Sequence, residues 1–313
     1  MLTNRDLSSR RFRCVLFIES LLVEKQMPQA TGLTENIVFR KFQLESIMLD
    51  SVICLVGRRR SGKSWAIRSL IHELGKRKVP YGKIFSGTEH CSPWFGEFFP
   101  KLFIENKVDD EKLRVILAKQ AKAVKEVRDR TGDKDGRRRS NNMMLVFDDM
   151  MSEDDSWSKS KHFRKLFVEG RHYNIIFIMA LQYVMGIRPD LRDNIDYAFL
   201  FANEGNNLKK LWENYAGVIP TFDMFKEIFH KFTRDKGCMV INKTSSSGDI
   251  RDQVFYYKAS DPGPFQFGCR QFWDAHERRY KEIEEISDEQ RIADTICMHG
   301  PSTQKYNISI SQS

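Results

Sequence analysis

Short apolar runs recur along the chain, separated by stretches with the spacing of amphipathic helices. The runs cover residues 51–56, 83–86, 143–147, 175–181 and 197–201. Runs of this length bounded by polar residues or glycine are typical of strands buried on both faces. Because helical segments intervene, we expect the strands to lie parallel with helices above and below them. The pattern predicts an α/β protein, a three-layer αβα sandwich with a mainly parallel central sheet.

The intervening stretches predict helices over residues 64–76, 109–130 and 159–170. The first of them places apolar side chains on one side and ends near a glycine. After residue 205 the pattern is mostly helical, with a polar turn at 244–248, a strand at 253–257 and a charged helix at 271–286.

The same pattern divides the chain into segments. We expect an N-terminal arm or added edge strand over 1–36, a core over 37–205 with a charged helical insertion at 105–140, a mostly helical extension over 206–298, and a disordered tail at 299–313.

Composition narrows the class of protein. The 313 residues include 23 Phe and 5 Trp, enough aromatic side chains to fill a normal core, and no apolar run is long enough for a transmembrane helix. The six cysteines form no C-x-x-C pair, which argues against structural zinc and favours reduced thiols in an intracellular protein. The net charge is +9, and residues 57–83 hold nine Lys and Arg against one acid. This balance suggests a polyanionic partner.

One motif carries specific chemistry. The segment Gly57, Arg58, Arg59, Arg60, Ser61, Gly62, Lys63 and Ser64 matches G-x-x-x-x-G-K-S in full, between a predicted strand and a predicted helix. The glycines let the backbone wrap an anion, and the N–H groups at the start of the helix point at phosphates. Lys63 can reach the β- and γ-phosphates, and the hydroxyl of Ser64 can bind Mg²⁺. The predicted nucleotide-binding segment runs from Gly57 to Trp65.

Two acids end the predicted strand 143–147. Asp148 is expected to hold Mg²⁺ and Asp149 to orient or deprotonate the attacking water. An extra strand near residue 84, together with the second acid, points to the ASCE/RecA-like branch of P-loop ATPases that perform mechanical work.

Three arginines and a glutamine complete the candidate site. Gln182 directly follows the strand 175–181, where an amide can sense the γ-phosphate. Arg171 precedes that strand, and Arg188 and Arg192 follow it. Any of the three could be an arginine finger that reaches the γ-phosphate of a neighbouring copy, a group that accelerates hydrolysis by about 10³–10⁵.

Several segments together resemble a known family. These are the P-loop at 57–64, the run 145–149, Gly170-Arg171-His172-Tyr173-Asn174, and the segment 182–197, which reads LQY-x-MGI-x-PDLR-x-NIDY when the preceding Leu181 is included. They look like the DNA-packaging ATPases of nucleocytoplasmic large DNA viruses, within the FtsK–HerA superfamily. The resemblance covers residues 37–205. One departure is Asp149, where the wider superfamily usually has Glu.

The resemblance implies a ring-forming motor that uses ATP and Mg²⁺ to push double-stranded DNA into a preformed capsid. Carried over by motif, Lys63, Asp149, Gln182 and Arg171 are the catalytic residues, with Arg171 favoured as the finger, and Ser64 and Asp148 bind Mg²⁺. The expected partners are the backbone of double-stranded DNA, further copies of the chain, and a capsid, portal or membrane surface. The expected location is the host cytoplasm, in a viral factory, or the virion.

Basic residues at 111–139, including Arg137, Arg138 and Arg139, are candidate DNA contacts. Three alternatives stay open: a terminase-like or other FtsK–HerA pump, an assembly protein that binds ATP without moving DNA, and a small-molecule kinase. Residues 206–313, after the core, hold no acid cluster of the kind that a nuclease needs for two metals, which argues against a terminase.

Overall fold

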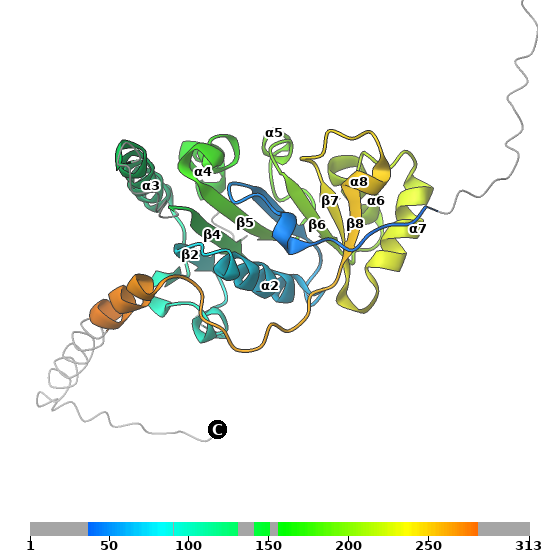
Figure 1. The fold of residues 1–313 in the computed structure, drawn as a ribbon. Coiled ribbons are helices and arrows are strands. Elements are labelled where there is room, and N and C mark those ends of the chain that lie inside the picture. The colour runs from blue at the N-terminus through cyan, green and yellow to red at the C-terminus, as the bar shows by residue number, and fades with distance from the viewer. Residues whose placement is uncertain (1–36, 90, 131–140, 151–155, 281–313) are drawn as a thin grey trace, which may run out of the picture. The chain divides into compact units, whose positions relative to one another are not determined.

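The computed structural model describes residues 37–89, 91–130, 141–150 and 156–280. Over these residues the chain forms one eight-stranded sheet in the order β3-β2-β4-β5-β1-β6-β7-β8 (Figure 1). The strands are β1 Val52–Val56, β2 Tyr81–Ser86, β3 Ile104–Glu105, β4 Met143–Asp148, β5 Ile175–Leu181, β6 Tyr197–Phe201, β7 Cys238–Asn242 and β8 Val254–Tyr257. The first six are parallel, and β7 and β8 are antiparallel. The predicted α/β fold with a mainly parallel sheet is confirmed.

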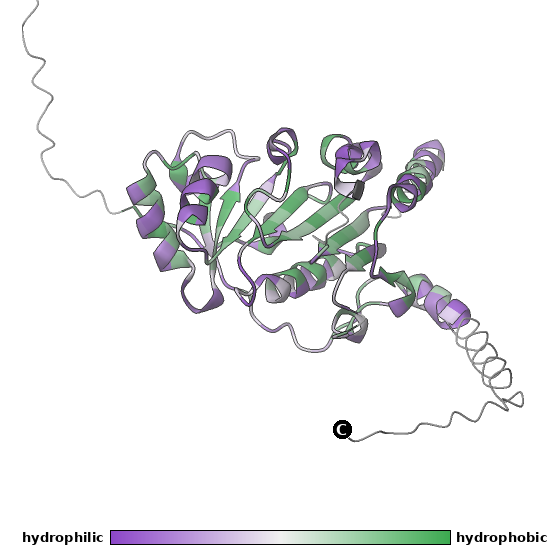
Figure 2. Ribbon diagram, turned by 180° about the vertical axis from the view of Figure 1, so that it is seen from behind, coloured by the Kyte–Doolittle hydropathy of each residue, from purple (hydrophilic) through white to green (hydrophobic). Residues whose placement is uncertain are grey.

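Helices cover both faces of this sheet (Figure 1). α2 packs on one face, and α3, α4, α5, α6 and α7 pack on the other. Their bounds are α2 Lys63–Lys76, α3 Asp110–Arg130, α4 Lys161–Val168, α5 Pro189–Arg192, α6 Asn206–Tyr215, α7 Phe222–Phe232 and α8 Ile250–Gln253. Short 3₁₀ turns are η1 Leu44–Ser46, η2 Phe95–Glu97, η3 Lys101–Phe103, η4 Ser156–Lys159, η5 Gly170–Tyr173 and η6 Arg234–Lys236. Figure 2 shows apolar residues concentrated on the strands and polar residues on the outer sides of the helices.

The strand register aligns the ends of the central strands. In β1, Val56 lies beside Leu181 of β5 and Leu200 of β6. In β4, Phe147 lies beside Met179 of β5. The carboxyl ends of β1, β4 and β5 therefore reach the same edge of the sheet, which we call the carboxyl edge.

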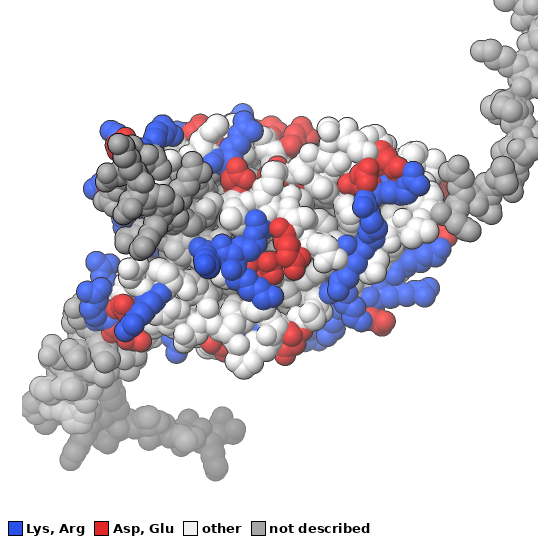
Figure 3. Space-filling model, viewed as in Figure 1, with Lys and Arg blue, Asp and Glu red and all other residues white. Residues whose placement is uncertain are grey.

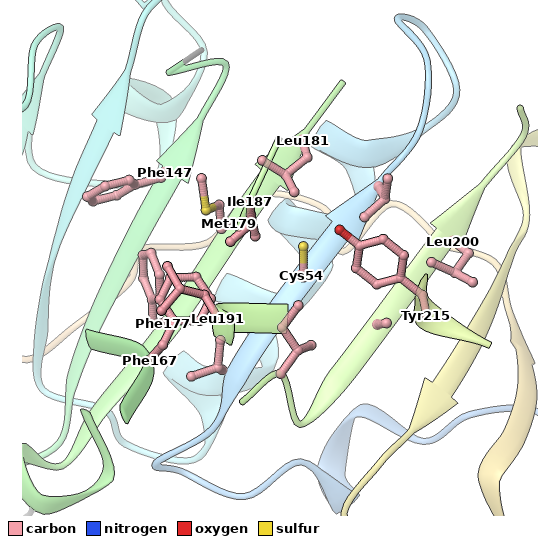
Figure 4. Packing of buried hydrophobic residues seen from close by; sticks show 14 of the residues in the cluster. Cys54, Phe147, Phe167, Phe177, Met179, Leu181, Ile187, Leu191, Leu200 and Tyr215 are labelled. Atoms are coloured by element: carbon pink, nitrogen blue, oxygen red, sulfur yellow. The ribbon is translucent and has the colours of Figure 1, made fainter. Parts of the chain in front are cut away.

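Aromatic side chains group together on one side of the core on the α3–α7 face (Figure 4). Phe177 is fully buried and makes edge-to-face contacts with Phe147 and Phe167, with ring centroids 5.1 and 5.3 Å apart. Such pairs add stabilisation beyond the burial of apolar area. This cluster ties α4 to the two strands whose ends carry the candidate catalytic residues.

The C-terminal extension contains one strand that the sequence pattern did not predict. Besides α6, α7 and the expected strand at 253–257, which is β8, it holds β7 at Cys238–Asn242, which pairs with β6. A run of only four apolar residues cannot be assigned to strand or buried helix from periodicity alone. The arm at 1–36, residues 131–140 of the insertion and the tail at 299–313 lie outside the described residues. Over the described part of the chain, no helix is both long and apolar enough to cross a membrane.

Replacing Phe177 by Ala is expected to destabilise the fold by about 3–5 kcal/mol, because the cavity that it leaves cannot be refilled by its aromatic neighbours. Urea denaturation followed by circular dichroism measures the change. The control is Val168→Ala on α4, since Val168 is 41% exposed and its truncation should change stability little. Equal effects of the two changes would contradict this account of the core.

Candidate nucleotide-binding site

The segment 57–64 forms a P-loop between β1 and α2. Gly57 lies so close to β6 that a Cβ there would be 2.5 Å from the Cβ of Phe201. Gly62 has φ +109° and is the residue before the first turn of α2, and Arg60 has φ +59°. The left-handed backbone at Gly62 favours glycine. Both motif glycines are thus required by the geometry of the loop.

The side chain of Lys63 folds back over this loop. Its Nζ donates hydrogen bonds to the carbonyl oxygens of Gly57 at 2.7 Å and Arg58 at 2.9 Å. Burial lowers the pKa of Lys63, while the negative charges of Asp148 and Asp149 oppose that shift. The ammonium therefore lies at the carboxyl edge, close to both aspartates.

Asp148 ends β4 and is the more strongly perturbed of the two acids. Burial, followed by the charge of Asp149, raises the pKa of Asp148 from 3.8 to about 6, and the ammonium of Lys63 partly offsets this. A raised carboxylate pKa in a concave site is common where a cation or a ligand binds.

Asp149 follows with φ +52°. A positive φ is uncommon outside glycine, and Asp is one of the residues that adopt it most readily. Its Oδ1 accepts a hydrogen bond from Nε2 of Gln182, and Oε1 of Gln182 accepts one from Nε of Arg59 at 3.1 Å. The structure thus brings together Asp149, Gln182 and Arg59 in one hydrogen-bonded chain above the ends of β4 and β5.

A cavity of about 660 Å³ opens beside these groups. It is lined by Arg60, Gly62, Lys63, Ser64, Trp65, Ser86, Thr88, Glu89, Ser92, Pro93, Trp94, Phe95, Asp148 and Lys236. Trp65 and Trp94 meet edge to face at its wall, with ring centroids 6.4 Å apart. The size and the mixture of cations, hydroxyls and aromatic rings fit a nucleotide.

The oxygen atoms in this cavity fit Mg²⁺. Ser64 and Asp148 line it together, and Ser86 is paired with Asp148 in the sheet register. The Oγ of Ser86 is buried and has no hydrogen-bond partner within the described part of the chain. Hydroxyl and carboxylate oxygens are the ligands that Mg²⁺ prefers.

The candidate arginine fingers lie in three different settings. Arg171 is in η5, before β5, and lines a separate cavity of about 500 Å³ at the amino ends of the strands. Arg188 is exposed and pairs with Asp190 at 3.0 Å. Arg192 is only 4% exposed and its guanidinium contacts the sulfur of Met185. Burial of Arg192 is suited to a structural role.

The three loop arginines separate in the structure. Arg58 forms an ion pair with Glu204 at 2.6 Å, Arg59 contacts Gln182, and Arg60 lines the cavity. The candidate DNA contacts Arg137, Arg138 and Arg139 lie outside the described residues.

Sequence reasoning missed several residues that line the cavity. Ser86 ends a predicted strand and could have been found, because strand ends meet at one edge. Glu89 could not have been found from the sequence, because its position depends on a folded loop. Its carboxylate accepts hydrogen bonds from the backbone N–H groups of Trp94, Phe95 and Gly96. Lys236 lies 173 residues beyond Lys63 and belongs to no recognisable motif.

Asp148→Asn is expected to stabilise the ligand-free protein at pH 7.5 by about 1–2 kcal/mol, because it removes a buried charge. Because the pKa of Asp148 is raised in the folded state, its charge lowers the free energy of unfolding fully above about pH 6. This destabilisation disappears as the pH falls towards about 4. Urea denaturation from pH 4 to 8 measures the gain, with exposed Asp129→Asn as the control. A gain that does not depend on pH would refute the assignment.

Comparison with known proteins places the chain among viral proteins. A family model described as the Poxvirus A32 protein matches residues 39–247. An uncharacterized protein of Acanthamoeba polyphaga mimivirus is 33% identical over 241 residues, which are 77% of this chain and 83% of that relative. An uncharacterized protein of Invertebrate iridescent virus 3 is 33% identical over 227 residues, 71% of this chain and 82% of the relative.

Among solved structures, the genome packaging NTPase B204 from Sulfolobus turreted icosahedral virus 2, in complex with AMP, is 15% identical with a TM-score of 0.47. The match covers 69% of this chain and 100% of that chain, and a likeness this distant carries no functional argument. The family model, in contrast, spans more than half of the chain. The chain therefore belongs to the Poxvirus A32 protein family, and the resemblance to proteins of nucleocytoplasmic large DNA viruses is confirmed.

Proposed function

We propose that this protein hydrolyses ATP to move double-stranded viral DNA into a preformed capsid. The observation that carries the proposal is the convergence of the P-loop with Asp148 and Asp149 at one edge of the sheet. Lys63 lies close enough to both acids for their charges to oppose its lowered pKa. Lys63 and Asp148 line the same cavity as Ser64, so one metal–triphosphate can contact these three residues. Asp149 does not line that cavity; it follows Asp148 directly, at the end of β4.

Each residue has a distinct task in hydrolysis. The backbone N–H groups at the start of α2 and the ammonium of Lys63 bind the phosphates. Ser64 and Asp148 would hold Mg²⁺, which when bound neutralises the charge of the triphosphate. Asp149 would orient the attacking water and accept its proton. Its carboxylate lies one methylene closer to the backbone than that of Glu, so the water has to sit closer to the strand end.

Gln182 links this water site to the P-loop. Its amide nitrogen donates to Asp149, and its amide oxygen accepts from Arg59. Such a chain fixes the direction in which the carboxylate of Asp149 points. Gln182 directly follows β5 and contacts both Arg59 and Asp149. A shift of the γ-phosphate that moves Gln182 would therefore also move the P-loop and the catalytic acid.

The favoured arginine finger acts between copies. Arg171 lies at the amino ends of the strands, whereas the P-loop lies at the carboxyl edge. Within one copy the two sites are on opposite edges of the sheet, so Arg171 can only serve the site of a neighbour. Hydrolysis would then depend on self-association into a ring.

DNA binding would use Lys and Arg side chains and the phosphate backbone, without reading sequence. Figure 3 shows Lys and Arg gathered in a central group, with acids beside it, and in a longer band on the right. Contacts of this kind weaken steeply as salt rises, because bound counterions are released. We also propose that the protein contacts the capsid or its portal.

Lys63→Ala is expected to lower DNA-stimulated ATP turnover by about 100-fold or more, since it removes the charge that follows the phosphates into the transition state. A phosphate-release assay with and without DNA measures turnover. Lys76→Ala on the same helix is the control, because the side chain of Lys76 is 61% exposed and distant from the loop. Full turnover in Lys63→Ala would refute the proposal. If the protein without substitutions hydrolyses no ATP with or without DNA, the result would favour the alternative of an assembly protein that binds ATP without moving DNA.

Arg171→Ala is expected to lose most of its ATP turnover, and mixing it with Lys63→Ala is expected to restore part of it. In a mixed ring, the Lys63→Ala copy supplies its intact Arg171 to the intact P-loop of the Arg171→Ala copy. Phosphate release over a series of mixing ratios measures the recovery. Arg114→Ala, an exposed arginine on α3, should behave like the unchanged protein. No recovery at any ratio would exclude Arg171 as the finger.

A further inference from the structure

We propose that Lys236 is a further phosphate-binding residue of the nucleotide site, which contacts the α- and β-phosphates shared by ATP and ADP. Lys236 ends η6, just before β7, in the C-terminal part of the chain. It lines the same cavity as Lys63, Ser64 and Asp148. The inference deepens the proposed function and rests on its nucleotide site.

The main chain of Lys236 lies directly against the P-loop. A Cβ at Gly62 would be 3.0 Å from the carbonyl oxygen of Lys236 and 3.1 Å from its Cβ. Gly62 precedes the first turn of α2, whose N–H groups are placed to bind phosphate. The side chain of Lys236 therefore starts within a few ångströms of the phosphate-binding backbone.

The sheet order tells which phosphates Lys236 can reach. Asp148 ends β4, two strands from β1 on one side, and β7 lies two strands from β1 on the other side. The catalytic acids and Gln182 mark where the γ-phosphate must lie. Lys236 approaches from the opposite flank of the P-loop, so it faces the part of the nucleotide that is not transferred.

The turn that presents Lys236 is strained. Asp235 has φ +51° and Lys236 has φ +64°, two successive left-handed residues that are not glycine. The next residue, Gly237, is packed so closely that a Cβ would lie 2.3 Å from the carbonyl oxygen of Phe232. Strain of this kind persists where the surroundings fix the backbone, and it concentrates at ligand sites.

The charge of Lys236 is available to a ligand. Its side chain is exposed, and among the described residues no acid lies within ion-pair distance of it. The cavity holds three cations, Arg60, Lys63 and Lys236, against the two acids Asp148 and Glu89. These five side chains leave an excess of positive charge in the cavity, and the polyphosphate of a nucleotide would balance it.

The test is a binding titration by calorimetry with two probes, Mg²⁺–ADP and Mg²⁺ with a non-hydrolysable ATP analogue. Lys236→Ala is expected to weaken both by about tenfold, the loss of one charge-assisted contact. Lys236→Gly removes the same charge while relieving the positive φ, so its unfolding midpoint should not fall. Lys236→Arg should keep most of the affinity, and Lys226→Ala, on the exposed side of α7, should change neither.

Unchanged ADP affinity in Lys236→Ala and Lys236→Gly would overturn the proposal. Loss of affinity for the ATP analogue alone would also overturn it, because that result would place the ammonium at the γ-phosphate. The titration needs neither turnover nor DNA, so it is separate from the motor proposal. A protein that binds both probes but never hydrolyses ATP would refute the motor and leave the Lys236 result standing.

Discussion

The parallel register of β4, β5 and β1 is the constraint on which the site depends. Because these strands end together, the P-loop, the aspartates and Gln182 arrive at one edge without any help from long loops. A backbone hydrogen bond of 3.1 Å from the N–H of Gly57 to the carbonyl oxygen of Leu181 joins the P-loop to the end of β5. A shift of one residue in that pairing would separate Gln182 from the loop and turn its neighbours to the opposite face.

The ligand-free edge is unfavourable by itself. Asp148 holds a charge against burial, the hydroxyl groups of Ser61 and Ser86 lack partners among the described residues, and Arg60 and Asp149 have positive φ. None of these features stabilises the fold. In the proposed site, a bound cation would offset the charge of Asp148, and bound phosphates would offer partners to the hydroxyl groups. The aromatic core under β4 and β5 supplies the stability that allows them.

Strands and motifs, which depend on residues close together in the chain, could be predicted from the sequence. Contacts between segments that lie far apart in the chain could not. Apolar runs predicted β1, β5 and β6 because a buried parallel strand has a short, continuous pattern. The same criterion missed β7, since four apolar residues after two helices fit either structure. Motif spacing gave the P-loop and the aspartates. It could not reveal Lys236, which reaches Gly62 only because β7 joins the sheet beside β6.

The position of Arg171 has a consequence for assembly. The P-loop lies at one edge of the sheet and Arg171 at the other, so a contact that joins them between copies connects two unlike surfaces. A head-to-tail arrangement makes this contact once at each interface, and it closes into a ring when the rotation between copies divides a full turn. A two-fold dimer makes the contact twice, and only if the two copies lie antiparallel, so that each Arg171 meets the P-loop of the other copy. If the finger is Arg171, either arrangement needs a second copy, and only the head-to-tail one leaves a free Arg171 and a free P-loop at its ends for further copies.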